Sequence, residues 1–145
     1  SGEDYHMHYT ASKLQTDLAG KKILLVEDHK LNMEIAKKIL EKKQMKVTCA
    51  YNGAEAVALF EKMPEYTFDA VIMDIRMPVM NGLEAAAAIR AGAKADAKTI
   101  PIIAMSANAF AEDMEKSRRA GMNRHVAKPV EPERLFGVLS EIFSD

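Results

Sequence analysis

Short apolar runs alternate along this chain with segments in which apolar residues recur every three or four positions. The run at residues 23–26 is continuous, as expected of a parallel strand that is buried on both faces. The recurring positions are typical of amphipathic helices. The pattern predicts five strands, at residues 23–26, 45–50, 69–73, 100–105 and 125–127. It predicts a helix after each strand, over residues 31–40, 56–63, 83–89, 110–120 and 135–142.

Strands that alternate with helices in this way are joined by right-handed crossovers into a parallel sheet. We therefore predict an α/β fold, a flavodoxin-like (βα)5 doubly wound five-stranded parallel sheet with strand order 2-1-3-4-5. The predicted domain spans residues 20–145. Residues 1–19 lack sustained periodicity, and we interpret them as a linker or remnant. Because the chain does not begin with Met, we expect it to be a segment of a longer protein.

Composition narrows the class of protein. The 145 residues carry a formal net charge of -1 and are 48% hydrophobic, which suits one domain with a substantial core. A nearly neutral chain does not bind nucleic acid through bulk positive charge. No apolar stretch approaches the roughly 20 residues that span a bilayer, so we expect no membrane contact by this segment. The one cysteine, Cys49, has no partner for an internal disulfide, which favours a cytoplasmic location.

Polar groups end four of the predicted strands. These groups are three carboxylates, a hydroxyl and an ammonium, supplied by Glu27, Asp28, Asp74, Ser106 and Lys128. Ligands of open α/β sheets bind at the carboxyl ends of the strands, so these side chains can meet in one pocket. Each residue alone has a simpler explanation, because charged residues commonly mark the exit from a strand and serine commonly caps a turn. Their joint placement favours a site.

The predicted strand order puts Asp28 and Asp74 beside each other. Neighbouring carboxylates repel one another unless a cation lies between them, and a hard oxygen site of this kind suits Mg²⁺. A Ca²⁺ loop would need acids close together in sequence, and zinc would need a set of Cys or His ligands. A carboxylate beside such a metal can attack phosphorus, which makes Asp74 the candidate for an acyl-phosphate intermediate. Lys128 and Ser106 could each bind a further phosphoryl oxygen.

The chain resembles the receiver domains of two-component response regulators over about residues 20–145. The matching motifs are ILLVED at 23–28, VIMDIRMP at 71–78 with NG at 81–82, IIAMSA at 102–107 and KP at 128–129. This resemblance implies that Asp74 accepts a phosphoryl group from a phosphohistidine donor, either a histidine kinase or a histidine phosphotransfer protein. The implied Mg²⁺ ligands are Glu27, Asp28, Asp74 and the backbone carbonyl of Arg76. It also implies that Ser106 and Lys128 sense the phosphoryl group and that the bond before Pro129 is cis.

One position departs from the family pattern. His125 stands three residues before Lys128, where receivers often carry Tyr or Phe as the aromatic half of a switch. We consider Ser106 and His125 as switch residues, with a histidine packed in the strand as the alternative for His125. The output must be a change of shape, because the phosphoryl group itself adds only local charge. We expect that change on the face formed by residues 110–120, the last strand and the last helix, which includes Met114, Arg118, Arg119 and Arg124.

The segments at 32–33 and 106–110 resemble receivers of hybrid sensor histidine kinases. We therefore expect a phosphorelay role within a kinase parent, either soluble or anchored in a membrane, while the isolated domain catalyses only its own phosphorylation and dephosphorylation. A standalone response regulator is the first alternative. An aspartate-nucleophile phosphatase is the second, but it typically has an acid two residues after the nucleophile, where Arg76 stands. A nucleotide-binding domain would need a glycine-rich phosphate loop, which the sequence lacks.

Overall fold

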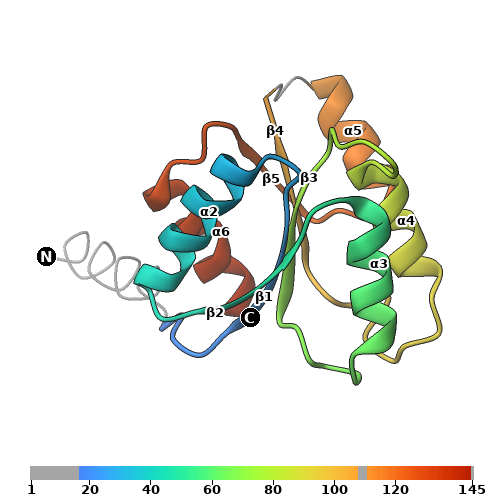
Figure 1. The fold of residues 1–145 in the computed structure, drawn as a ribbon, viewed down its shortest axis with the longest axis horizontal. Helices are drawn as coiled ribbons and strands as arrows, with labels where there is room; N and C mark the ends of the chain where they lie inside the picture. The colour runs from blue at the N-terminus through green and yellow to red at the C-terminus, as the bar shows by residue number, and fades with distance from the viewer. Residues whose placement is uncertain (1–16, 108–110, 145) are drawn as a thin grey trace, which may run out of the picture.

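The computed structural model describes residues 17–107 and 111–144. Within these ranges the chain forms one parallel sheet with helices on both faces (Figure 1). The strands are β1 (Lys22–Val26), β2 (Lys46–Ala50), β3 (Ala70–Asp74), β4 (Ile102–Ser106) and β5 (Arg124–Ala127). The helices are α2 (Lys30–Lys42), α3 (Gly53–Lys62), α4 (Gly82–Ala91), α5 (Ala111–Arg119) and α6 (Pro132–Phe143). The order β2-β1-β3-β4-β5, with all neighbouring pairs parallel, confirms the predicted fold.

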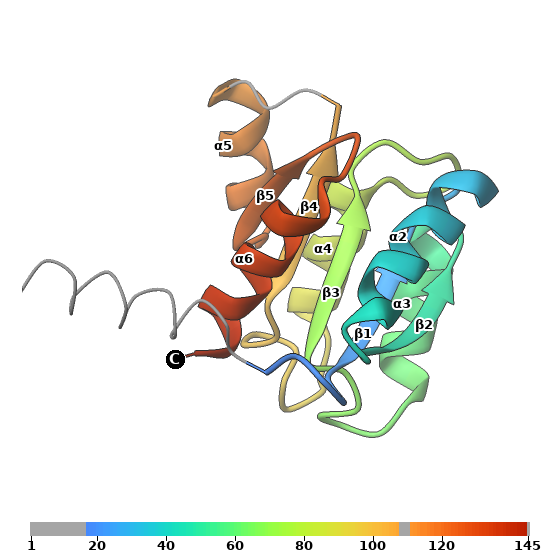
Figure 2. The same cartoon turned by 90° about the vertical axis from the view of Figure 1, so that its left-hand side faces the viewer.

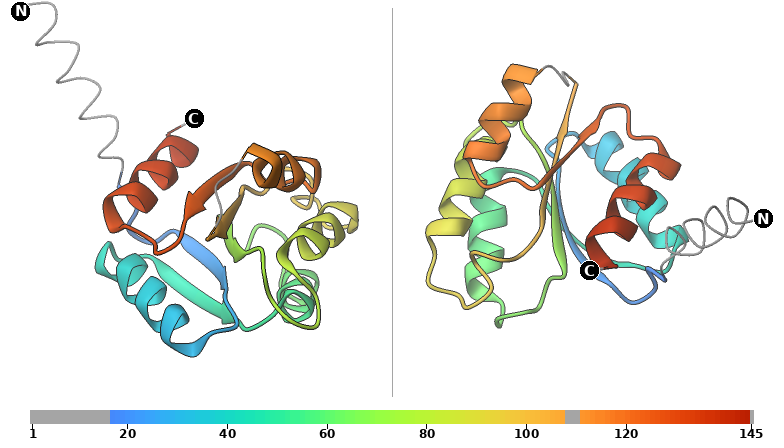
Figure 3. Two further views of the ribbon diagram at one scale, coloured as in Figure 1. Left: turned by 90° about the horizontal axis from the view of Figure 1, so that it is seen from above. Right: turned by 180° about the vertical axis from the view of Figure 1, so that it is seen from behind.

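Two layers of helices cover the sheet. Helices α2 and α6 lie on one face, as Figure 2 shows, and α3, α4 and α5 lie on the other (Figure 3). Alternate residues of β1 serve the two faces: Leu24 and Val26 pack with residues of α3 and α4, whereas Ile23 and Leu25 pack with residues of α2 and α6. The strands are apolar on both sides because both faces are covered.

The register of the strands aligns their carboxyl ends. Val26 of β1 lies beside Met73 of β3, Met73 beside Ala104 of β4, and Ala104 beside His125 of β5. The residues that follow in each strand therefore arrive at one edge of the sheet. β3 lies at the centre of the sheet, and all five of its residues are buried, including Asp74 at its end.

Side-chain caps begin three of the helices at this same edge. The Asn52 side chain accepts the Glu55 N–H at the start of α3, and the Asn81 side chain accepts the Glu84 N–H at the start of α4. The Glu84 side chain in turn accepts a hydrogen bond from the Asn81 N–H, which completes a capping box. At the start of α2, the His29 Nδ1 atom accepts the Asn32 N–H at 3.4 Å. These caps fix where each loop at the edge of the sheet ends.

The observed elements differ from the predicted ones mainly at their ends. β3 and β4 each extend one residue further than predicted and include Asp74 and Ser106 as strand residues. The backbone of these two residues is consequently held by the hydrogen bonds of the sheet and does not belong to a loop. The first predicted residue of the helix at 110–120 lies outside the described residues, and α5 ends at Arg119.

Residues 1–16 of the predicted linker also lie outside the described residues. Leu18, which is described, is buried in the core shared by α2 and α6, and the Gly20 N–H donates to the Gln44 carbonyl at 2.9 Å. In the part of the chain that the structure describes, no helix has both the length and the apolar character needed to cross a bilayer.

Candidate functional site

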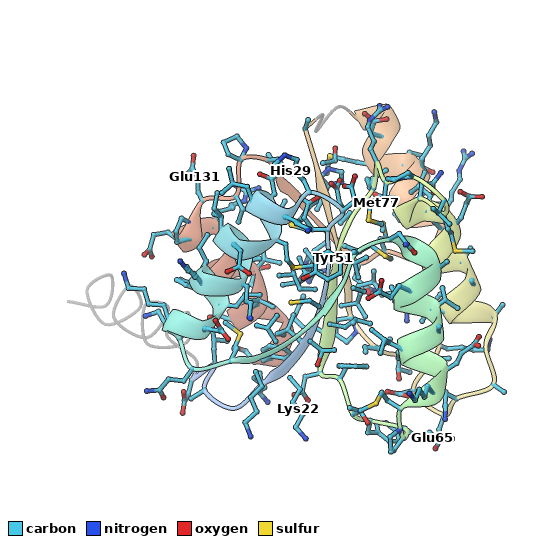
Figure 4. The ribbon with its side chains drawn as sticks, in the orientation of Figure 1. Lys22, His29, Tyr51, Glu65, Met77 and Glu131 are labelled. Carbon is cyan, nitrogen blue, oxygen red and sulfur yellow. The ribbon has the colours of Figure 1, made fainter. Side chains whose placement is uncertain are left out.

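Three carboxylates gather at the carboxyl edge of the sheet. Glu27 and Asp28 follow β1, and Asp74 ends β3, so that one oxygen from each lies within 4.8 Å of the others. Glu27 and Asp74 are 2% and 5% exposed, whereas Asp28 is exposed. Figure 4 shows this edge from the side, with the labelled neighbours His29, after Asp28, and Met77, in the loop after Asp74. The structure therefore brings together the three acids that the sequence singled out.

Lys128 bridges the two buried acids. Its Nζ atom lies 2.7 Å from Glu27 Oε1 and 2.8 Å from Asp74 Oδ2. Its backbone N–H donates to the Ser106 carbonyl at 2.9 Å, which continues the β4–β5 ladder to the end of β5, and the Lys128–Pro129 bond is cis, as predicted. Burial lowers the pKa of the ammonium, but its hydrogen bonds to Asp74 and Glu27 outweigh burial and hold the pKa above its ordinary value. Lys128 is therefore a cation at neutral pH.

Backbone amides orient the same two carboxylates. The Arg76 N–H donates to Asp74 Oδ1 at 3.2 Å, and the His29 N–H donates to Glu27 Oε2 at 3.0 Å. Each buried carboxylate thus has one oxygen on Lys128 and the other on a loop amide. Two directional contacts fix the plane of each carboxylate, which is the preorganisation that a reacting group needs.

A divalent cation suits this arrangement. The three carboxylates outnumber the one ammonium, so the cluster keeps an excess of negative charge at neutral pH. Hard carboxylate oxygens from Glu27, Asp28 and Asp74 lie close enough to share one ion, and they are the ligands that Mg²⁺ prefers. The donor set therefore fits the predicted metal. The role of the Arg76 carbonyl as a further ligand remains a prediction.

The two proposed switch residues lie in different surroundings. Ser106 is buried at the end of β4, beside Ala127 of β5, and so lies at the same edge as the acids. His125 lies two residues further back along β5, half-buried, and lines a groove between α5 and α6. The structure thus brings Ser106 to the edge that carries the acids but does not bring His125 there.

Two glycines, which have no side chain to bind or react, allow the loop after Asp74 to pack closely. Gly82 begins α4, and a Cβ atom there would overlap the backbone carbonyl oxygen of Asp74 itself. Gly53 begins α3, and a Cβ atom there would overlap the Met80 carbonyl oxygen. Gly82 belongs to the NG motif at 81–82, whereas Gly53 lies in none of the motifs quoted above. The signal for Gly53 was the Asn52-Gly53 pair between a strand and a helix, because such a pair marks a tight turn.

The chain matches the family model described as "Response regulator receiver domain" over residues 23–140. It is 35% identical over 122 residues to hybrid signal transduction histidine kinase I of Dictyostelium discoideum, and 37% identical over 137 residues to probable histidine kinase 4 of Oryza sativa subsp. japonica. These alignments cover 83% and 82% of this chain but only 7% and 13% of the two kinases.

Solved structures agree with the family match. The receiver domain of a sensor histidine kinase from Pseudomonas aeruginosa PAO1, crystallised with a magnesium ion in its active-site cleft, aligns with a TM-score of 0.78 at 36% identity, covering 88% of this chain and all of that one. Chemotaxis protein CheY4 of Vibrio cholerae aligns with a TM-score of 0.78 at 29% identity, covering 86% of this chain and 99% of its own. The chain belongs to the response regulator receiver domain family and is homologous to the receiver domains of hybrid histidine kinases.

Replacing Asp28 with Asn tests the excess charge of the site. In EDTA we expect Asp28→Asn to raise the free energy of unfolding by about 1 kcal/mol, because it removes one of three mutually repelling carboxylates. With excess Mg²⁺ the wild type should gain more stability than the variant, because bound ligand stabilises the folded state. Urea titrations measure both, with Glu34→Gln on the exposed face of α2 as the control. Equal stability of wild type and Asp28→Asn in EDTA would contradict the repulsion.

Proposed function

We propose that this receiver domain takes a phosphoryl group from a phosphohistidine onto Asp74 in a Mg²⁺-dependent reaction and signals by changing shape. The observation that supports this proposal most strongly is the position of Asp74. Its carboxylate ends the central strand, is buried, and is held by Lys128 on one oxygen and by the Arg76 N–H on the other. A carboxylate that is fixed in this way beside two further acids suits phosphoryl transfer better than a purely structural role.

The transfer itself is a simple exchange of bonds. An Asp74 carboxylate oxygen attacks phosphorus and forms an O–P bond, while the P–N bond to the donor imidazole breaks and its electron pair remains on that nitrogen. Glu27, Asp28, Asp74 and the Arg76 carbonyl would hold the metal, which when bound supplies positive charge that neutralises the phosphoryl oxygens. Lys128 contributes a positive charge of its own, since its ammonium already contacts Asp74 Oδ2.

We place the domain in a phosphorelay within a hybrid histidine kinase. The domain would lie in the cytoplasm, either in a soluble kinase or in the cytoplasmic part of a membrane-anchored one. The relatives named above are histidine kinases of which this chain covers a small part, which supports such a parent. The donor is accordingly a phosphohistidine on a kinase or a phosphotransfer protein. A standalone regulator remains the alternative architecture. The phosphatase alternative loses support, because the residue two positions after Asp74 is Arg76, whose side chain is exposed.

The output surface in this proposal is the groove between α5, β5 and α6. Residues lining it include Met114, Arg118 and Arg124, and its volume is about 870 Å³. Arg118 is engaged within α5, where its Nη2 atom lies 2.6 Å from Glu115 Oε1. A movement of α5 would change the shape of this groove, and the phosphoryl group would cause that movement through Ser106, at the end of β4 that leads into α5.

Intact mass spectrometry tests the acceptor assignment. After incubation with Mg²⁺ and acetyl phosphate, the wild type should gain one phosphoryl group and Asp74→Asn should gain none. Asp69→Asn is a matched control, because Asp69 directly precedes the same strand at its opposite end. A phosphoryl adduct on Asp74→Asn at the yield of the wild type would refute the assignment.

Replacing Ser106 with Ala tests the route of the signal. Asp74 and its metal ligands remain in Ser106→Ala, so we expect it to accept phosphate yet lose most of the change in α5. The coupling that is lost would be about 1 to 3 kcal/mol, the usual range for allosteric proteins. NMR shifts across α5, with and without beryllofluoride, measure the response in both proteins. Equal responses would mean that the signal passes through Lys128 or His125 instead.

A further inference from the structure

The loop after Asp74 lies against α3, which supplies neither the three carboxylates of the site nor its lysine. Gly53, the first residue of α3, donates its backbone N–H to the Met80 carbonyl at 3.0 Å. A Cβ atom on Gly53 would overlap that carbonyl oxygen and would lie 2.9 Å from the Asn81 carbonyl oxygen. Both neighbours are backbone atoms, which cannot move aside as the end of a flexible side chain can. The close approach of the loop to α3 therefore depends on the missing side chain of Gly53.

The loop is under strain next to this contact. Val79 has a φ of 70°, and the Met80 N–H donates to the Pro78 carbonyl at 2.8 Å, so Val79 is the central residue of a three-residue turn. A β-branched residue rarely adopts a positive φ, and such a conformation persists only where its surroundings enforce it. The Val79 side chain is 84% exposed and makes no tight packing of its own. The constraint must come from the backbone contacts on either side of the turn.

Those contacts connect α3 to the Asp74 carboxylate. On one side of the turn is the hydrogen bond from the Gly53 N–H to the Met80 carbonyl. On the other side, the Gly82 N–H donates to the Ile75 carbonyl at 2.8 Å, which closes the loop onto the end of β3. Within the closed loop, the Arg76 N–H reaches Asp74 Oδ1 at 3.2 Å. A displacement of the Met80 carbonyl by an added Cβ atom would consequently be passed to the amide that orients Asp74.

We infer that Gly53 is a positioning residue for Asp74: its contact with the Met80 carbonyl sets the loop whose Arg76 amide orients the acceptor carboxylate. The expected effect of Gly53 on phosphorylation rests on the proposed function. The expected effect of Gly53 on the Arg76 amide is independent of that function. The same backbone contacts join the two ends of the loop, so we expect a metal at the acidic site to change the surroundings of the Gly53 amide as well. The start of α3 thereby acts on phosphoryl transfer without contacting the phosphoryl group.

Gly53→Ala is the decisive variant, and Gly137→Ala is its matched control. Gly53 lies in α3 and does not have a positive φ, so the effect of Gly53→Ala comes from the contact of the new Cβ atom and not from its backbone angles. A Cβ atom on Gly137 of α6 meets nothing within 4 Å. In metal-free protein, the NMR shift of the Arg76 amide should change in Gly53→Ala and stay at its wild-type value in Gly137→Ala. With saturating Mg²⁺ and acetyl phosphate, phosphorylation of Gly53→Ala should be slower by about tenfold to a hundredfold, as small misplacements of reacting groups produce.

Each outcome decides the inference. A folded Gly53→Ala protein with the wild-type Arg76 shift and the wild-type rate would overturn it. If Gly53→Ala does not fold, the wild type decides: Mg²⁺ at saturation should shift the Gly53 amide, and an unchanged amide would overturn the inference. A wild type that is never phosphorylated would refute the proposed function, while the Arg76 shift in the metal-free variants would still report on the positioning by Gly53.

Discussion

The contact of the Lys128 ammonium with Glu27 and Asp74 is the interaction on which the site depends. Two carboxylates that are almost completely buried would repel each other and lose their hydration if nothing compensated them. Lys128 touches both, and it arrives from β5, two strands away from β3. The ammonium thus ties the first, third and fifth strands together at one edge, and it leaves a negative charge there that suits a divalent cation.

The fold makes this contact possible through register and not through local structure. The parallel strands align so that the residue after Val26, the last residue of β3 and the segment after Ala127 come to the same edge. Helices α2, α3 and α4 begin from capped turns at that edge. Gly82 lets the loop after Asp74 close onto the end of β3, and Gly53 lets the same loop pack against α3. Rigid strands and short closed loops together hold the carboxylates in place before any ligand arrives.

Much of this arrangement was predictable because it depends on local pattern and on general rules of topology. Apolar runs ending in Asp74, Ser106 and Lys128 predicted both the strands and the edge at which they meet. The unequal burial of the adjacent residues Glu27 and Asp28 was not predictable, because it depends on which one faces Lys128. The contact of Gly53 with Met80 was missed for a related reason. It depends on how closely α3 and α4 pack, and that distance is set by tertiary structure between residues far apart in the sequence.

The most direct test of this account is the pKa of Lys128 in metal-free protein, followed by NMR of its side chain as the pH rises. Two opposing effects act on this ammonium, because burial favours the neutral amine while the carboxylates favour the cation. We predict that Lys128 titrates above the ordinary lysine value of 10.5 and that Glu27→Gln lowers its pKa toward that value. A wild-type pKa at or below 10.5, unchanged in Glu27→Gln, would show that Lys128 does not hold the two carboxylates together.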